Sequence, residues 1–183
     1  MKLIIISSSP NKDGLTAACA AAARDGIVEA GGEVALVSLN DLQVGMCQAC
    51  ENGWGTCLEQ HECQVLDDFQ DLHQRTWAAE GLVLVTPVYW GEMSESAKAF
   101  TDRLRRCEAN RDEESALRGK PVLAVAAAGG SGGGMITCLA SMERWIQHVR
   151  GRTFDLLPVN RWSRAYKLDA IRAAAKALTL ELK

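Results

Sequence analysis

The chain has 183 residues, and its 20 basic and 23 acidic side chains give a net charge of −3. This balance excludes the strongly basic character of a typical nucleic-acid binder. The first apolar run, residues 3–6, is too short for a signal-peptide core or a membrane span. We therefore expect one cytoplasmic domain over residues 1–183 that binds neither nucleic acid nor membrane.

Strand-like and helix-like segments alternate along the chain. In order, the pattern predicts strand 2–7, helix 16–30, strand 33–39, helix 67–79, strand 81–86, helix 94–107, strand 120–128, helix 134–149, strand 153–159 and helix 166–180. Such alternation indicates a parallel sheet with helices on both faces. The shortest doubly wound α/β solution is a flavodoxin-like five-stranded parallel sheet; its strand order, 2-1-3-4-5, is inferred by analogy, because periodicity does not give an order.

Between the second strand and the next helix, an irregular insertion over about residues 41–65 holds four of the seven cysteines. Cys47, Cys50, Cys57 and Cys63 have the spacing C-x2-C-x6-C-x5-C. Four thiolates this close in sequence are able to hold an iron–sulfur cluster or a tetrahedral metal such as zinc. A thioredoxin-like dithiol at the first two cysteines would leave the other two unexplained. The three remaining cysteines lie in predicted helices, where we expect buried thiols.

Ligands of doubly wound sheets bind at the carboxyl ends of the strands. After the first strand, residues 7–16 offer hydroxyl groups, backbone amides and the start of a helix, which together favour a phosphate. From the residues alone, an ordinary turn with a threonine cap fits equally well.

Two further loops are predicted at the same edge. Residues 86–94 contain Tyr89 and Trp90 beside glycine and proline, so they either frame a flat heteroaromatic ring or form a surface turn whose aromatic side chains pack on the core. Residues 129–134 are five glycines and one serine, which would let a ligand touch the backbone or would form a flexible loop. Neither a P-loop nor a G-x-G-x-x-G motif is present. Trp145 and Trp162 are expected in the core or at an interface.

These segments resemble the flavodoxin-like NAD(P)H-dependent FMN reductase and quinone reductase superfamily. Residues 8–16 (SSPNKDGLT) are similar to its G-S-P-R-x-x-G-N-T-like loop, and residues 86–91 (TPVYWG) to its S-P-V-Y-[WF]-G loop. Residues 97–103 (AKAFTDR) resemble its L-K-x-F-x-D-R helix, and the glycine stretch also fits. Asn11 and Leu15 stand where arginine and asparagine are common, so the grip on a phosphate would rest on backbone amides, Ser9 and Thr16, with charge from Lys12.

Within that superfamily, the cysteine insertion resembles the iron–sulfur flavoproteins, which carry FMN and a four-iron cluster. The resemblance implies that Cys47 and Cys50 are the first two ligands, and Cys57 and Cys63 are the natural remaining ones. Cys57 follows the second ligand by seven residues, whereas three is common in the family. The resemblance also implies that FMN contacts the three loops, through Ser7, Ser9, Asn11, Lys12, Leu15, Thr16, Pro87, Val88, Tyr89, Trp90, Gly91, Gly129, Gly130, Ser131 and Gly132.

The expected function is that of an FMN-dependent oxidoreductase that passes electrons between FMN and a [4Fe-4S] cluster. The resemblance implies a redox donor such as NAD(P)H or ferredoxin and assembly as a homodimer or a dimer of dimers. General acid–base side chains do not stand out, which suits chemistry carried by cofactors. Two alternatives stay open: an electron carrier without its own substrate, and an NAD(P)H-dependent FMN or quinone reductase whose cysteine loop binds zinc or stays free.

Overall fold

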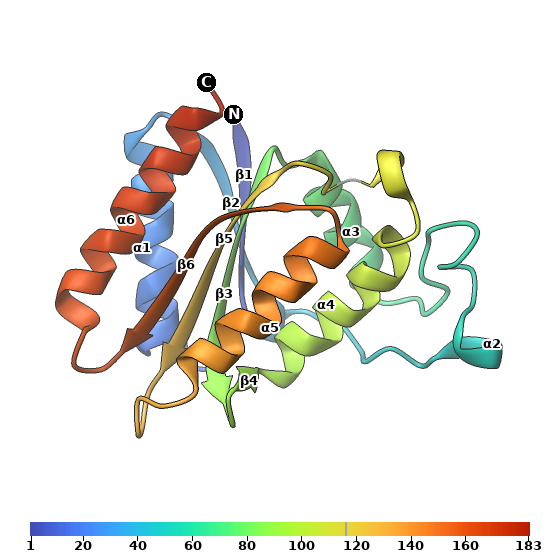
Figure 1. The fold of residues 1–183 in the computed structure, drawn as a ribbon, viewed down its shortest axis with the longest axis horizontal. Helices are drawn as coiled ribbons and strands as arrows, with labels where there is room; N and C mark the ends of the chain where they lie inside the picture. The colour runs from blue at the N-terminus through green and yellow to red at the C-terminus, as the bar shows by residue number, and fades with distance from the viewer. Residues whose placement is uncertain (116) are drawn as a thin grey trace.

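The computed structural model of the chain describes residues 1–115 and 117–183. Its main sheet consists of parallel strands in the order β2-β1-β3-β5-β6 (Figure 1). These strands are β1 (Lys2–Ser7), β2 (Glu33–Ser38), β3 (Gly81–Tyr89), β5 (Pro121–Ala128) and β6 (Arg152–Asn160).

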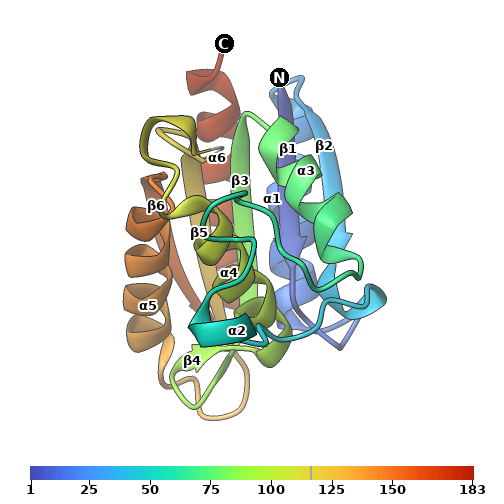
Figure 2. The ribbon, with the colours of Figure 1, turned by 90° about the vertical axis from the view of Figure 1, so that its right-hand side faces the viewer.

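Helices cover both faces of the sheet (Figures 1 and 2). One face carries α1 (Leu15–Glu29) and α6 (Arg164–Glu181), and the other carries α3 (Phe69–Ala78), α4 (Glu95–Glu108) and α5 (Met135–His148). Three short helical segments complete the fold: η1 (Leu39–Asp41), α2 (Cys50–Gly53) and η2 (Asp112–Glu114).

The core has two halves, one on each face of the sheet. Side chains alternate along a strand, so Leu3 and Ile5 of β1 pack under α1 and α6, whereas Ile4 and Ile6 pack under α3, α4 and α5. Because the central strands are buried on both faces, they are continuously apolar, as parallel strands between two helical layers must be. The frame therefore owes its stability to apolar burial on both sides of one sheet.

The predicted flavodoxin-like class and the order of the parallel strands are confirmed. The prediction of five strands was incomplete, because β4 (Glu92–Met93) adds an antiparallel partner to β3. This pairing is possible because β3 continues to Tyr89 instead of ending at Thr86, and the chain then turns back at Trp90 and Gly91. Within the described residues, no helix has both the length and the apolar character needed to cross a bilayer.

Candidate functional site

The parallel strands β1, β3 and β5 all end at one edge of the sheet, at the bottom of Figure 1, which we call the carboxyl edge. The three loops singled out in the sequence leave these strands side by side. Hydrogen bonds tie two of them together: Ser8 N donates to Val85 O over 3.1 Å, Ser94 Oγ to Ser8 O over 3.3 Å, and Ser94 N to Thr86 Oγ1 over 3.1 Å. The predicted convergence of the loops is therefore present in the fold.

The first loop ends in the amino terminus of α1. Gly14 occupies the N-cap position, and its lack of a side chain leaves the amides of the first helical turn accessible. Ser9 Oγ donates to Asn11 O over 2.8 Å and accepts from Asn11 N, which closes the turn before the helix. Lys12 Nζ lies 3.0 Å from Asp41 Oδ1 at the start of the cysteine insertion. This end of α1 is a suitable anion site, but its nearest cation is already shared with a carboxylate.

The second loop is a tight hairpin rather than an open loop. Val88 pairs with Met93 and Tyr89 with Glu92, so only Trp90 and Gly91 form the turn. Both have positive φ, 51° and 82°, as a two-residue turn of type I′ requires. The conformation is costly for tryptophan and normal for glycine. Consequently the Trp90 side chain stands fully exposed at the tip of the hairpin.

The third loop, residues 129–134, packs against a tryptophan from β6's end. Gly132 has φ of 69°, and a Cβ atom built on it would lie 2.5 Å from the ring of Trp162. Gly132 N donates to Gly129 O over 2.9 Å, and Gly133 N to Ser131 Oγ over 3.3 Å. The loop is thus a hydrogen-bonded turn whose close approach to an indole requires glycine.

The cysteine insertion, residues 41–65, lies outside α4 on the side away from the sheet (Figures 1 and 2). Its four cysteines are partly buried and all line one small pocket, which we call the cysteine pocket. Ala49 and Glu51 have positive φ angles, 44° and 51°, which cost energy for residues other than glycine. The pocket is completed by Gln48, Ala49, Gly53, Gly55, Thr56, Gln64, Val65, Arg103 and Arg106.

A fully buried arginine on α4 holds this insertion in place. Arg103 Nε donates to Cys63 Sγ over 3.3 Å, and its other nitrogens donate to Gly45 O over 3.1 Å and Val65 O over 2.7 Å. Arg103 Nη1 also pairs with Asp67 Oδ2 at 2.6 Å. One guanidinium therefore joins the beginning and the end of the insertion to the frame.

The electrostatics of this anchor favour the ion pair. Burial alone would raise the pKa of Asp67, but hydrogen bonds from Arg103, Gly45 and Phe69 lower it below its ordinary value. For Arg103, burial would lower the pKa, and the hydrogen bonds to Asp67 and Cys63 raise it. Both groups therefore remain charged at neutral pH.

Four thiols that share one pocket, with guanidinium groups beside them, form a donor set that suits an iron–sulfur cluster or another soft metal centre. Across the described parts of the chain, the structure has no three His, Cys, Asp or Glu side chains placed to hold a single metal ion. The fit to a metal centre thus rests on the donor type and the shared pocket.

Comparison with known proteins decides the family. A model of the NADPH-dependent FMN reductase family matches residues 1–154. The chain belongs to this family. It is accordingly a flavin-dependent oxidoreductase, and the family predicted from the loop motifs is confirmed.

Among the individual relatives of this FMN reductase family member are proteins named iron–sulfur flavoprotein. One from Methanosarcina thermophila is 31% identical over 154 residues, which span 82% of this chain and 75% of the relative. One from Methanocaldococcus jannaschii is 34% identical over 105 residues, which span 57% of this chain and 52% of the relative. The chain therefore spans about half the length of the second relative and three quarters of the first.

Solved structures agree on the fold. An NAD(P)H:quinone oxidoreductase from Methanothermobacter marburgensis superposes with a TM-score of 0.73 at 17% identity, over 97% of this chain and 96% of that one. An archaeal flavodoxin superposes with a TM-score of 0.68 at 15% identity, over 100% and 99% of the two chains. At these identities the likeness establishes the flavodoxin-like architecture of the family member and nothing finer.

Two residues of this FMN reductase family member were missed by the sequence analysis. Arg103 is the last residue of the AKAFTDR segment. The match of this segment to a family motif pointed to Arg103, but the motif did not show that Arg103 contacts the cysteine insertion. Trp162 was expected in the core or at an interface; its side chain is 64% exposed, so it is not in the core, and it lies against Gly132. Its position just after Asn160, where β6 ends at the carboxyl edge, was the available signal. Trp145 is in the core as predicted, and its indole N–H donates to Thr101 O over 3.0 Å.

The other three cysteines differ from the four in the insertion. Cys19, Cys107 and Cys138 are fully buried in α1, α4 and α5, as predicted. Burial raises the pKa of the Cys19 and Cys138 thiols to about 12, and it raises that of Cys107 still further. These thiols are protonated at neutral pH and act as small apolar side chains.

Proposed function

We propose that this oxidoreductase binds FMN at the carboxyl edge and a four-iron cluster in the cysteine pocket, and that it passes electrons between them. The observation that carries the proposal is that all four insertion cysteines line one pocket, fixed to the flavodoxin-like frame by Arg103. The names of the relatives, iron–sulfur flavoproteins, support the same pairing of cofactors. NAD(P)H or ferredoxin is the proposed electron donor. The proposed compartment is the cytoplasm, which keeps thiols reduced.

In this proposal, each of the three loops contacts a different part of FMN. The first turn of α1 receives the phosphate through its amides and hydroxyls, and the hairpin and the glycine turn approach the ring with backbone atoms. The proposed contacts are Ser7, Ser9, Asn11, Lys12, Leu15 and Thr16 for the phosphate, and Pro87, Val88, Tyr89, Trp90, Gly91, Gly129, Gly130, Ser131 and Gly132 for the rest. Bound there, FMN would supply exchange between two-electron and one-electron chemistry, and a cluster held by the four insertion cysteines would supply one-electron chemistry.

In the cysteine pocket, Cys47, Cys50, Cys57 and Cys63 are the proposed ligands. Arg103 donates to Cys63 Sγ, so it orients that sulfur and offsets negative charge on it. Arg106 also lines the pocket; its guanidinium lies 4.6 Å from the Trp54 ring, and it donates to Gly53 O. Two cations beside four thiolates would stabilise the reduced, more negative state of a cluster.

We further propose a homodimer or a dimer of dimers. The cysteine insertion lies outside α4, whereas the flavin loops lie at the carboxyl edge (Figure 1). Assembly that places the insertion of one subunit against the carboxyl edge of another would shorten the electron path. The fully exposed Trp90 and the largely exposed Trp162 and Tyr166 are suitable apolar contacts. Mass measurement in solution at micromolar concentration tests this, and a monomer would reject it.

The deciding experiment is the visible spectrum and the cofactor analysis of anaerobically purified protein. We expect flavin bands, broad iron–sulfur absorption, one FMN, and about four iron and four sulfide per chain. One zinc per chain with neither iron nor sulfide would reject the cluster and leave a plain flavin reductase. Turnover with NAD(P)H and a quinone or flavin acceptor then separates an enzyme from an electron carrier that has no substrate.

A further inference from the structure

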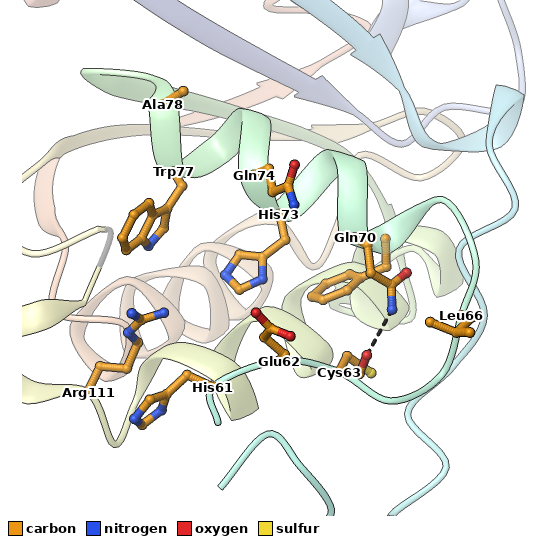
Figure 3. Close-up of a pocket in the computed structure, with 11 residues that line it drawn as sticks. His61, Glu62, Cys63, Leu66, Gln70, His73, Gln74, Trp77, Ala78 and Arg111 are labelled. Atoms are coloured by element: carbon orange, nitrogen blue, oxygen red, sulfur yellow. Dashed lines mark hydrogen bonds between the residues drawn. The ribbon is translucent and has the colours of Figure 1, made fainter. Parts of the chain in front are cut away.

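A second cavity lies between α3 and the end of the cysteine insertion, and we call it the α3 cavity (Figure 3). Its volume of about 430 Å³ is within the range of small-molecule sites. It is separate from the carboxyl edge, so neither the flavin nor the hairpin accounts for it. Its lining residues are His61, Glu62, Cys63, Leu66, Phe69, Gln70, His73, Gln74, Trp77, Ala78 and Arg111.

Two unsatisfied polar atoms mark this cavity. Among the described residues, two buried side-chain atoms lack a hydrogen-bond partner, His61 Nδ1 and Arg111 Nε. Both residues line the α3 cavity. Buried polar groups are nearly always paired, because leaving one unpaired is costly. Arg Nε is a donor only, so its partner must be an acceptor atom. His61 also has a left-handed backbone, with φ of 60°, which is a strained position for histidine.

The walls of the cavity favour a flat apolar body. Trp77 is half-exposed and Phe69 is buried beneath the cavity, so aromatic surface faces the space. The Arg111 guanidinium carbon lies 5.0 Å from the centre of the Trp77 ring, which places the unpaired donor beside an aromatic face. Figure 3 shows Trp77, Arg111 and His61 at one end of the cavity and Leu66 at the other. An aromatic ring stacked in the cavity would meet the donor at that end.

The charges decide against an anionic ligand. Arg111 Nη1 lies 3.8 Å from Oε1 of the fully buried Glu108, whose same oxygen is 2.6 Å from His73 Nε2. Glu62, which lines the cavity itself, adds a second carboxylate to this neighbourhood. The charge of Arg111 is therefore opposed by two acidic groups, and a ligand carboxylate or phosphate would meet repulsion. A neutral carbonyl oxygen satisfies the Nε donor without that cost.

We propose that the α3 cavity binds a neutral, planar aromatic compound that carries a carbonyl oxygen. The carbonyl accepts from Arg111 Nε, the ring stacks beside Trp77, and His61 contacts the ligand's edge. Cys63 lines both this cavity and the cysteine pocket, so the two cavities share one residue of their walls. The inference goes beyond the proposed function, since it concerns a second site and requires neither FMN nor a cluster to be correctly assigned.

The test measures the affinities of three probes for the purified protein by ligand-detected NMR, with excess FMN present to fill the flavin site. Chromone is planar, neutral and carries a carbonyl; naphthalene lacks an acceptor; 2-naphthoate is an anion. We expect chromone to bind about tenfold more tightly than naphthalene, because only chromone pairs with Arg111 Nε. Weaker binding of chromone than of 2-naphthoate would overturn the argument from charge.

Variants locate the binding. Arg111→Lys keeps the positive charge and removes the Nε donor, so it should weaken chromone about tenfold and leave naphthalene unchanged. Trp77→Leu should weaken both probes. Arg118→Lys is the matched control, because Arg118 pairs with Glu113 on the surface and is not among the cavity's lining residues. If Arg111→Lys lowers the melting temperature, the chromone affinities of His61→Ala and Trp77→Leu show whether chromone binds in the α3 cavity. Absence of chromone binding, or equal binding to all variants, would reject the proposal.

Discussion

The flavodoxin-like frame and the cysteine insertion are stabilised by different means. Strands β1, β3 and β5 are buried on both faces and are held by apolar contacts from two helical layers. The insertion combines the packing of Leu42, Val44, Cys57 and Cys63 on the core with polar contacts, several of which come from Arg103. Gln70 adds two more, since its side-chain amide donates to Cys63 O and Val65 O over 2.8 and 2.7 Å.

This difference means that the frame and the insertion can be perturbed separately. Burial of apolar surface is distributed over many side chains, so the frame tolerates changes in the insertion. The insertion depends on a few directional bonds and, in our proposal, on its metal centre. Four experiments test how far this independence goes.

The largest expected effect is the loss of the cluster from Cys50→Ser. Iron and sulfide should fall close to zero, because one thiolate ligand is gone, while far-UV circular dichroism and the melting temperature of the frame change little. Cys138→Ser is the reciprocal control: a hydroxyl buried in α5 should lower the melting temperature by several degrees and leave iron intact. Loss of iron from both variants would contradict the separation.

The next effect is that of Arg103→Met, which leaves Asp67 without its buried partner. We expect a loss of about 3 kcal/mol in the free energy of unfolding, measured by urea denaturation, together with a reduced iron content. Arg24→Met is the control, because Arg24 is exposed and pairs with the neighbouring exposed Asp25 in α1. If the free energy of unfolding of Arg103→Met equals that of Arg24→Met, the guanidinium does not anchor the insertion.

A smaller effect is expected at the carboxyl edge. Gly132→Ala forces a Cβ atom toward Trp162 and a positive φ on alanine, so FMN affinity should fall about tenfold. Gly133→Ala is matched in size and loop, and its Cβ would meet only Ser131 Oγ at 3.6 Å, an ordinary contact. Fluorescence titration with FMN measures both. Equal affinities would argue against a role for the Gly132 backbone.

The smallest effect concerns pH. The pKa of Asp67 is lowered in the folded protein, so its contribution to stability is complete above the ordinary pKa of about 3.9 and is lost as pH falls through the folded value. In the cluster-free Cys50→Ser background, Asp67→Asn should therefore cost stability at pH 7, and the difference should shrink below about pH 3.9. A difference that stays constant with pH would show that Asp67 acts through its shape alone.

The sequence predicted the frame well because its signals are local. Apolar β-branched runs such as Leu3 to Ile6 identify buried strands, and glycines mark where helices end. The strand β4 was missed because two residues carry no periodicity. Strand β4 exists because the chain turns back at Trp90 and Gly91, and this turn gives Trp90 a positive φ that residues with a Cβ atom disfavour.

The site was predicted less completely, because its key contacts connect residues far apart in the chain. The three loops and four cysteines were identified by motif and spacing, and their roles stay predictions. Arg103 lies 40 residues from the sulfur it contacts, and no local pattern gives that partner. The α3 cavity likewise brings together His61, which precedes α3, and Arg111, which follows α4, so only the three-dimensional arrangement reveals it.

The ion pair between Lys12 and Asp41 has a consequence for how the two cofactor regions communicate. Lys12 belongs to the proposed phosphate loop and Asp41 begins the cysteine insertion, so a phosphate and a carboxylate compete for one ammonium group. By thermodynamic linkage, if FMN binding weakens the pairing of Lys12 with Asp41, then that pairing lowers the affinity for FMN by the same factor. Because both side chains are largely exposed, this antagonism is small and fades as ionic strength rises.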